Sequence, residues 1–84
     1  MDQAELKGTV RSCITRLLQE QDLEEEFEDS APLFTSGLLD SMSMLRLVST
    51  LERTLGIAMS PAEVTVDSFD TVEGICAAVL RSQK

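Results

Sequence analysis

The chain has 84 residues, which is enough for one small domain and too few for a second. Fifteen acidic against seven basic residues give a net charge of −8, which argues against binding to nucleic acid or to an anionic membrane surface. The sequence has no histidine, which excludes histidine-based triads, most zinc sites and the usual general base at neutral pH. We therefore expect a single domain over residues 1–84 that is not itself an enzyme.

The N-terminal segment, residues 1–5, is polar and acidic. It lacks the basic start and apolar run of a secretory signal. The longest apolar run, residues 75–80, is far shorter than the roughly 20 residues that span a bilayer. We expect a protein without a membrane span that works in the cytoplasm.

Residues 3 to about 20 are predicted to form the first helix, with Asp2 capping its start. Apolar residues recur at spacings of three and four, as one helix face requires. These residues are Leu6, Val10, Cys13, Ile14, Leu17 and Leu18. We interpret Cys13 and Cys76 as small buried core residues, with a disulfide or a reactive thiol as the alternative.

Residues 21–40 are predicted to be a long connection, a feature that is uncommon in small domains and often functional. Its second half is too apolar for a free linker, so we expect it to be pinned to the core, with Gly37 forming a turn. The apolar residues concerned are Leu33, Phe34, Leu38 and Leu39.

The acidic run at residues 20–29 holds seven of the fifteen acids, so the rest of the chain is nearly neutral. We interpret the glutamates at 24–26 as a solvated loop and not as a docking site. A calcium site is not favoured, because the acids lack the ligand spacing and the central glycine of an EF-hand loop.

The second helix is predicted from Ser41 to about Leu55, with Asp40 as N-cap and Gly56 after its last turn. Its predicted core stripe holds Leu45, Leu47, Val48, Leu51 and Leu55. Its predicted outer face holds Met42, Ser43, Met44, Arg46, Ser49 and Thr50.

The start signal Ser60-Pro61 precedes β-branched residues, so only a short and weak helix is expected there. Asp70 is the predicted N-cap of a last helix over residues 71 to about 81. Its predicted core face holds Val72, Ile75, Cys76, Val79 and Leu80. The expected fold is all-α: a bundle of three main helices and one short one, with the long loop between the first two main helices.

Ser41 is the candidate functional residue because of its setting: it opens the second helix directly after the capping Asp40 and four positions after the turn glycine Gly37. A helix N-terminus has unpaired N–H groups and the positive end of the helix dipole, so it accommodates an attached phosphate. Without a histidine to activate it, Ser41 is a poor nucleophile on its own. We predict that another enzyme modifies it; the alternative is that Ser41 only stabilises the first turn.

Residues 37–42 (Gly-Leu-Leu-Asp-Ser-Met) and 69–75 (Phe-Asp-Thr-Val-Glu-Gly-Ile) carry a resemblance that covers nearly the whole chain. The sequence resembles the acyl and peptidyl carrier proteins of fatty-acid, polyketide and nonribosomal-peptide synthesis. The resemblance implies a four-helix carrier bundle with 4′-phosphopantetheine attached to Ser41, and a cofactor thiol that holds an acyl or aminoacyl thioester. It also implies that Asp40 helps a phosphopantetheinyl transferase to recognise the site.

Two features depart from the fatty-acid type. Two residues, Leu38 and Leu39, separate the turn glycine from Asp-Ser, where acyl carriers usually have one. The second helix carries Arg46 and Arg53 beside a single acid, whereas the corresponding helix of fatty-acid carriers is acidic. The chain is thus more similar to stand-alone carriers such as the D-alanyl or aminoacyl carrier proteins, and we expect a role in specialised or natural-product metabolism.

The resemblance implies three kinds of partner acting on a monomer: the transferase, an adenylating acyl or aminoacyl ligase, and downstream enzymes that use the thioester. We expect apolar contacts, with charges setting specificity. The predicted contact residues are Leu38, Leu39, Met42, Arg46, Ser49 and Arg53. The competing hypothesis is a non-catalytic helical adaptor that binds a partner helix without any cofactor.

Overall fold

Four α-helices and one 3-10 turn make up the part of the chain that a computed structural model describes, residues 2–23 and 26–82; no strand occurs there. The elements are α1 (Gln3–Glu20), α2 (Ser41–Leu55), η1 (Pro61–Glu63), α3 (Val66–Phe69) and α4 (Val72–Ser82). Three long helices and one short α-helix confirm the predicted class. The predicted solvated run includes residues 24 and 25, which lie outside the described residues.

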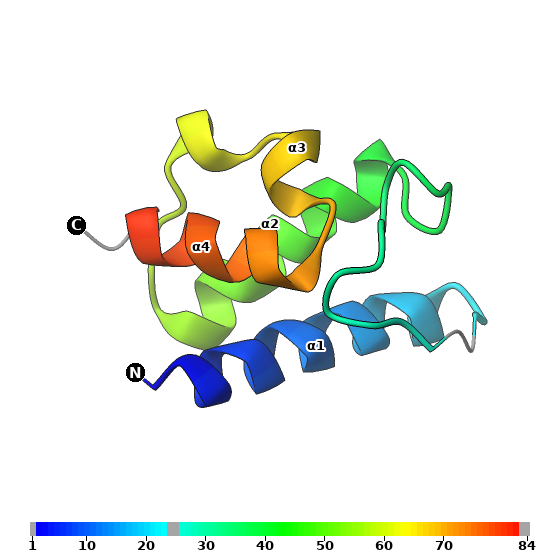
Figure 1. The fold of residues 1–84 in the computed structure, drawn as a ribbon, viewed down its shortest axis with the longest axis horizontal. Helices are drawn as coiled ribbons and strands as arrows, with labels where there is room; N and C mark the ends of the chain where they lie inside the picture. Colours follow the sequence, from blue (N-terminus) through cyan, green and yellow to red (C-terminus); the bar gives the residue numbers. More distant parts are fainter. Residues whose placement is uncertain (1, 24–25, 83–84) are drawn as a thin grey trace.

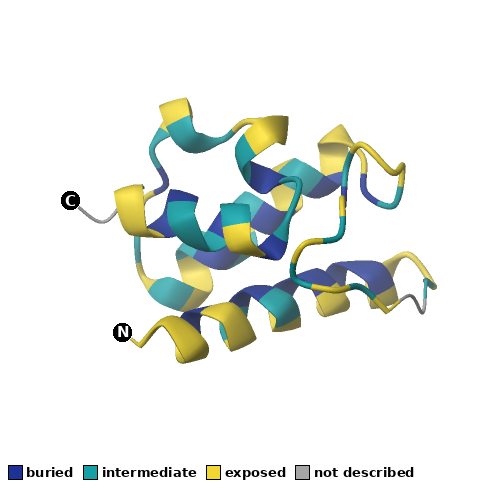
Figure 2. Ribbon diagram, viewed as in Figure 1, coloured by how far each residue is buried: buried dark blue, intermediate teal, exposed yellow. Residues whose placement is uncertain are grey.

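The helix α1 packs against both α2 and α4, and α3 packs against α4. The start of α1 and the end of α4 lie at one end of the molecule, whereas the start of α2 and the long connection lie at the other (Figure 1). Buried residues line the faces that the helices turn toward one another (Figure 2). No helix of the two described ranges has the length and apolar character needed to cross a membrane.

Three predicted helix boundaries are confirmed by the hydrogen bonds that cap them. Asp2 accepts from the backbone N–H of Ala4 at 3.0 Å, and Asp40 accepts from that of Ser43 at 2.9 Å. Gly56 ends α2 in the left-handed conformation, with φ of 67°, which a residue with a side chain rarely adopts. Local capping chemistry therefore fixes α2 between the residues that the sequence indicated.

The start of α4 corrects the prediction that Asp70 is its N-cap. The helix begins at Val72, and the hydroxyl of Thr71 accepts from the backbone N–H of Gly74 at 2.9 Å. Asp70 ends the short helix α3 and has a helical backbone, φ −71° and ψ −20°, whereas an N-cap residue has an extended one. The carboxylate of Asp70 is thereby left for other partners.

Two leucines predicted to lie in the core are exposed. Leu45 is 62% exposed and Leu80 is 42% exposed, so both predictions are wrong. Two residues of helix advance the side chain by about 200°. Leu45 is two residues before the buried Leu47, so it points away from the core, and Ser43, four residues before Leu47, points toward it.

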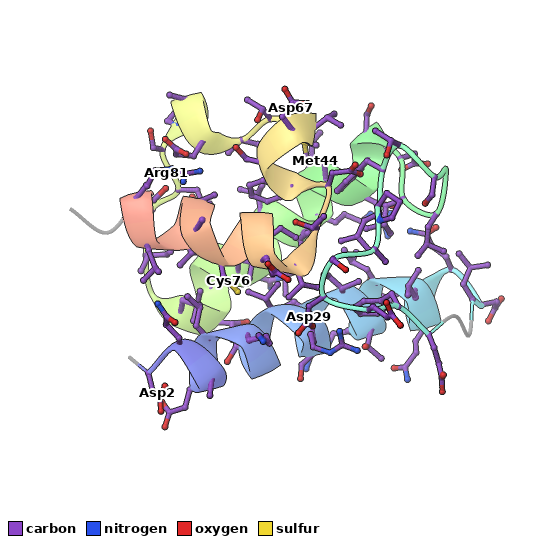
Figure 3. All side chains as sticks on the ribbon, in the orientation of Figure 1. Asp2, Asp29, Met44, Asp67, Cys76 and Arg81 are labelled. Atoms are coloured by element: carbon purple, nitrogen blue, oxygen red, sulfur yellow. The ribbon has the colours of Figure 1, made fainter. Side chains whose placement is uncertain are left out.

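The two cysteines are free thiols. Cys13 is buried, and Cys76 is half-buried between α4 and α1 (Figure 3). Burial raises the pKa of both thiols, which is the opposite of what an activated thiol needs. The interpretation as core residues is confirmed for Cys13 and holds in part for Cys76, and the two do not form a disulfide.

Candidate functional site

Ser41 is the first residue of α2 and is exposed. The side chain that caps the helix is that of Asp40, which bonds the N–H of Ser43. Among the described residues, no side-chain hydrogen bond uses the Ser41 hydroxyl. The first turn is thus stabilised by Asp40, and the Ser41 hydroxyl stands free at the end of the bundle.

Ser43, the other serine of this turn, is in the opposite situation. It is 1% exposed, and its hydroxyl accepts from the side-chain amide of Gln21 at 2.8 Å. The prediction that Ser43 lies on the outer face is therefore wrong. The bond joins the end of α1 to the start of α2, and it leaves Ser41 as the one accessible serine of this turn.

Asp40 is exposed and carries a charge beside Ser41. Hydrogen bonds from the backbone N–H and the hydroxyl of Ser43 hold the pKa of this carboxyl below its ordinary value. The site therefore presents an exposed hydroxyl next to a fixed carboxylate. The unpaired N–H groups of the first turn of α2 lie beside both.

The loop of residues 33–39 precedes this pair and is closed on itself. The N–H of Leu39 donates to the carbonyl of Leu33 at 2.8 Å, and both side chains are buried. Gly37 makes the turn between them with φ of 86°. The prediction that this half of the connection is pinned to the core is confirmed, with Phe34 and Leu38 half-buried against it.

The burial of Leu39 corrects its place among the contact residues. Leu39 is only 3% exposed, so it cannot offer its side chain to a docking enzyme in this conformation. Its neighbour Leu38 is half-buried and keeps part of its surface exposed. Of the two residues between Gly37 and Asp40, Leu39 is thus a core anchor and Leu38 is partly accessible.

Asp70 holds the start of the same loop, a role that the sequence prediction missed. Its carboxylate accepts from the N–H of Phe34 at 2.7 Å, from the N–H of Thr35 at 2.9 Å and from the Thr35 hydroxyl at 2.7 Å. These bonds, those of Thr35 foremost, hold the pKa of Asp70 below its ordinary value. The sequence contains one signal for this role. Asp70 and Thr71 are both residue types that cap helices, but a helix start needs only one cap, so one of the two is available for another contact.

The outer face of α2 next to Ser41 is apolar at its start. Met42 is 63% exposed, and Leu45, three residues later on the same side of the helix, is similarly exposed. A shallow groove brings Leu45 together with three of the predicted contact residues, Arg46, Ser49 and Arg53. The structure thus adds Leu45 to the face that the sequence predicted.

The same face is basic although the chain is strongly acidic. Arg46 lies 3.9 Å from Glu20, at the outer limit of an ion pair, and Arg53 forms no ion pair with any described residue. Glu52, the single acid of α2, has its carboxylate engaged by the N–H of Met59 at 2.9 Å. The exposed charge of α2 is therefore dominated by two arginines.

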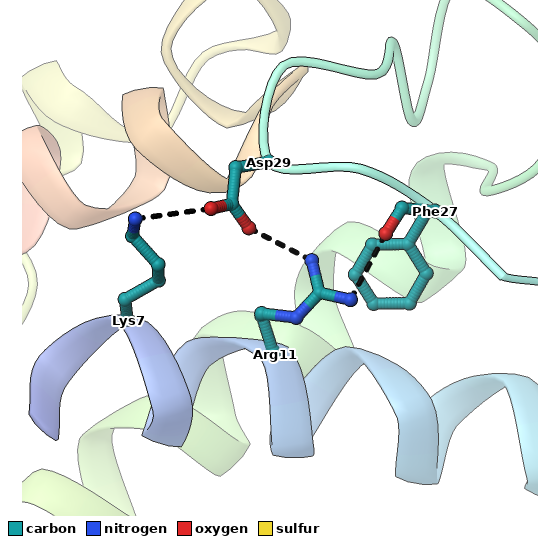
Figure 4. Close-up of polar contacts among 4 residues, drawn as sticks. All are labelled: Lys7, Arg11, Phe27 and Asp29. Carbon is teal, nitrogen blue, oxygen red and sulfur yellow. Dashed lines mark hydrogen bonds and ion pairs between the residues drawn. The ribbon is translucent and has the colours of Figure 1, made fainter. Parts of the chain in front are cut away.

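The acidic half of the connection is held to α1 by Asp29 (Figure 4). Its carboxylate lies 3.0 Å from the ammonium of Lys7 and 2.8 Å from the guanidinium of Arg11, and the Lys7 contact is the main cause of its lowered pKa. Arg11 also donates to the carbonyl of Phe27 at 2.9 Å and lies over the Phe27 ring, 4.5 Å from its centre. Within residues 2–23 and 26–82, no cluster of three or more potential ligands could hold a metal ion.

Two comparisons with known proteins give matches that span most of the chain. Residues 8–79 match the family model described as "Phosphopantetheine attachment site". A D-alanyl carrier protein from Abiotrophia defectiva is 30% identical over 74 residues, which cover 88% of this chain and 91% of that protein. No solved structure gives a significant match.

Proposed function

The chain belongs to the family of phosphopantetheine carrier proteins, which carry a covalently attached 4′-phosphopantetheine, and we propose that Ser41 is its attachment residue. The observation that carries the proposal is the free, exposed hydroxyl of Ser41 at the start of α2, beside the ionised Asp40. Ser43 is buried and bonded to Gln21, so it does not compete for modification.

The residues around Ser41 suit a phosphodiester. In the transfer from coenzyme A, the Ser41 oxygen forms a bond to the phosphorus next to the pantetheine as the phosphoanhydride bond of coenzyme A breaks. Adenosine bisphosphate leaves, and the hydroxyl proton passes to a base of the transferase. The unpaired N–H groups and the dipole of α2 favour the negative charge that remains on the phosphodiester. Asp40 keeps this end of the helix in place and gives the transferase a carboxylate to recognise.

The cargo that we propose is supported by the cofactor of the family and by the similar D-alanyl carrier protein. When bound, the cofactor's terminal thiol holds an acyl or aminoacyl group as a thioester. The name of the similar D-alanyl carrier protein supports an aminoacyl group as the cargo of this chain. We assign its loading to an adenylating ligase and its use to downstream enzymes of specialised metabolism, with residues 1–84 acting in the cytoplasm as one monomeric carrier domain.

Partner enzymes contact the docking face of α2 in this proposal. We define the docking face by five exposed side chains of α2, from the turn that holds Ser41 to the last turn, which are Met42, Leu45, Arg46, Ser49 and Arg53. Its apolar start suits an apolar recess next to the partner's active site, and its two arginines suit acidic groups at the rim of that recess. This polarity is the reverse of that expected for fatty-acid carriers, whose second helix is acidic.

Intact-mass measurement tests the attachment. The chain is incubated with coenzyme A and a phosphopantetheinyl transferase of broad specificity, and we expect the mass to rise by one cofactor, located on Ser41 by fragmentation. Ser41→Ala abolishes the increase, whereas Ser12→Ala, at an exposed serine of α1, keeps it. An unchanged mass of the native chain, while a control carrier is modified, would reject the proposal and favour the cofactor-free adaptor.

A further inference from the structure

We propose that Asp70 is a positioning residue for the attachment site: by holding the loop of residues 33–39, it fixes where Asp40 and Ser41 stand relative to α3 and α4. The inference rests on the proposed function of Ser41. Asp70 is 29 positions after Ser41 in the sequence and does not reach it directly, so it acts through the loop.

The bonds that Asp70 receives all come from three consecutive loop residues. Its backbone carbonyl accepts from the N–H of Leu33 at 2.6 Å, and its carboxylate accepts from Phe34 and twice from Thr35. Four hydrogen bonds to one residue leave this stretch little freedom to rotate or slide. The carboxylate is free for this role because Thr71 caps α4 in its place.

The position of the loop start is passed on to Ser41 by a second set of contacts. The bond from Leu39 to the carbonyl of Leu33 closes the loop, and the Gly37 N–H donates to the carbonyl of Phe34 at 3.0 Å. Only Asp40 then separates Leu39 from Ser41. A displacement at residues 33–35 would therefore move the first residues of α2.

The junction that carries Asp70 is itself tightly packed. Gly74, in the first turn of α4, lies so close to α3 that a Cβ atom there would collide with the backbone carbonyl of Ser68. Phe69, the residue before Asp70, is fully buried. Asp70 therefore lies at a closely packed junction between α3 and α4. A residue that positions others needs such fixed surroundings.

The loop of residues 33–39 links the α3–α4 half to the start of α2. The principal helix contacts run from α1 to α2 and α4, and from α4 to α3. The loop held by Asp70 supplies a direct connection between Ser41 and the α3–α4 side. An enzyme that contacts both α2 and the loop would bind Ser41 in one fixed geometry. The conformational entropy of the loop is already lost on folding, so it is not lost again when the enzyme binds.

The experiment compares two replacements of the same side chain. Asp70→Ala removes all three carboxylate bonds. Asp70→Asn keeps an oxygen that accepts from the N–H groups of Phe34 and Thr35, and its amide can donate to the Thr35 hydroxyl. We expect Asp70→Ala to raise the KM of a broad phosphopantetheinyl transferase for the chain about tenfold with little change in kcat, because the competent loop is less populated. Asp70→Asn should stay within about threefold of the native chain.

Amide hydrogen exchange supplies a readout that does not depend on the cofactor. The N–H of Leu39 closes the loop, so in Asp70→Ala its exchange rate should rise at least about tenfold more than the rates of the Leu47 and Leu51 amides, which report the loss of global stability. Ile75→Val, a core change in α4, is the matched control for lost stability. It should leave both the KM and the Leu39 exchange near native values.

Two kinetic results overturn the inference: a native KM in Asp70→Ala, or an equal rise of KM in Asp70→Ala and Ile75→Val. Unchanged Leu39 exchange in Asp70→Ala also overturns it. If the native chain takes no cofactor at Ser41, the proposed function fails and the positioning role fails with it. In that case the exchange of Leu39 still decides whether Asp70 orders the loop, so the two failures are distinguishable.

Discussion

Two aspartates hold the long connection between α1 and α2, and they do so by different chemistry. Asp29 holds the acidic half to α1 through the side chains of Lys7 and Arg11. Asp70 holds the half next to Ser41 through backbone N–H groups and the hydroxyl of Thr35. The first attachment relies on long charged side chains that are partly exposed; its bonds to the main chain are the one from Arg11 to the carbonyl of Phe27 and a longer one, 3.3 Å, from the N–H of Glu73 to the carbonyl of Asp29. The second attachment relies on short, directional bonds to the main chain.

The difference matters for how precisely each half is placed. An exposed ion pair gains little because water and salt screen it and because long side chains lose freedom when they pair. Bonds to backbone groups fix the main chain itself, and a lost acceptor leaves a partly buried N–H without a partner. The half of the connection that leads to Ser41 is thus held more precisely than the acidic half.

The largest effect on stability should come from Leu33, which anchors the half of the connection next to Ser41 to the core. Leu33→Ala removes a fully buried side chain, and we expect a loss of about 2–5 kcal/mol in the free energy of unfolding, measured with urea. Leu45→Ala, at the exposed leucine of α2, is the matched control and should stay within about 0.5 kcal/mol of the native value. Equal losses for the two leucines would contradict the assignment of Leu33 to the core and Leu45 to the surface.

The features that the sequence predicted well depend on local chemistry. The ends of α1 and α2 follow from one helical period and from a capping residue beside it, as Asp2, Asp40 and Gly56 show. The apolar anchors of the loop were predictable as a class because exposed leucine and phenylalanine are costly in a free linker.

The errors arose where a distant residue decides the outcome. The core stripe of α2 could not distinguish Leu45 from Ser43, because the burial of Ser43 depends on α1 and on Gln21, 22 positions earlier. The partners of Asp70 lie 35 and 36 positions earlier, and its local pattern predicted a helix cap. No local rule contains either pairing.

A smaller effect is expected from pH, and its sign follows from Asp70. Its hydrogen bonds lower the pKa of the folded state below the ordinary value of 3.8. The stabilisation is therefore fully present above that value and is lost as the pH falls through the lower pKa of the folded state. Asp70→Asn cannot titrate, so the stability that the native chain has over this variant at pH 7 should shrink below about pH 4.

Urea unfolding of both chains from neutral to acid pH measures this difference. Asp29 and Asp40 also have lowered pKa values and titrate in the same direction, but they are common to the two chains and their contribution cancels in the comparison. A stability difference that stays constant down to pH 2.5 would show that the charge of Asp70 contributes nothing to its bonds.

The smallest effect on stability should come from the attachment of Asp29 to α1, and it should depend on the salt concentration. Arg11→Ala removes one of the two cations at Asp29 together with its contact to Phe27. We expect a small decrease in the melting temperature at low ionic strength that is reduced in about 1 M salt, where the Debye length is near 3 Å. Because Asp70 holds the half of the connection next to Ser41 separately, the rate of cofactor attachment to Ser41 should be unchanged in Arg11→Ala. A salt-independent loss of stability would mean that Arg11 acts by packing on Phe27, and a slowed attachment would mean that the two halves of the connection are coupled after all.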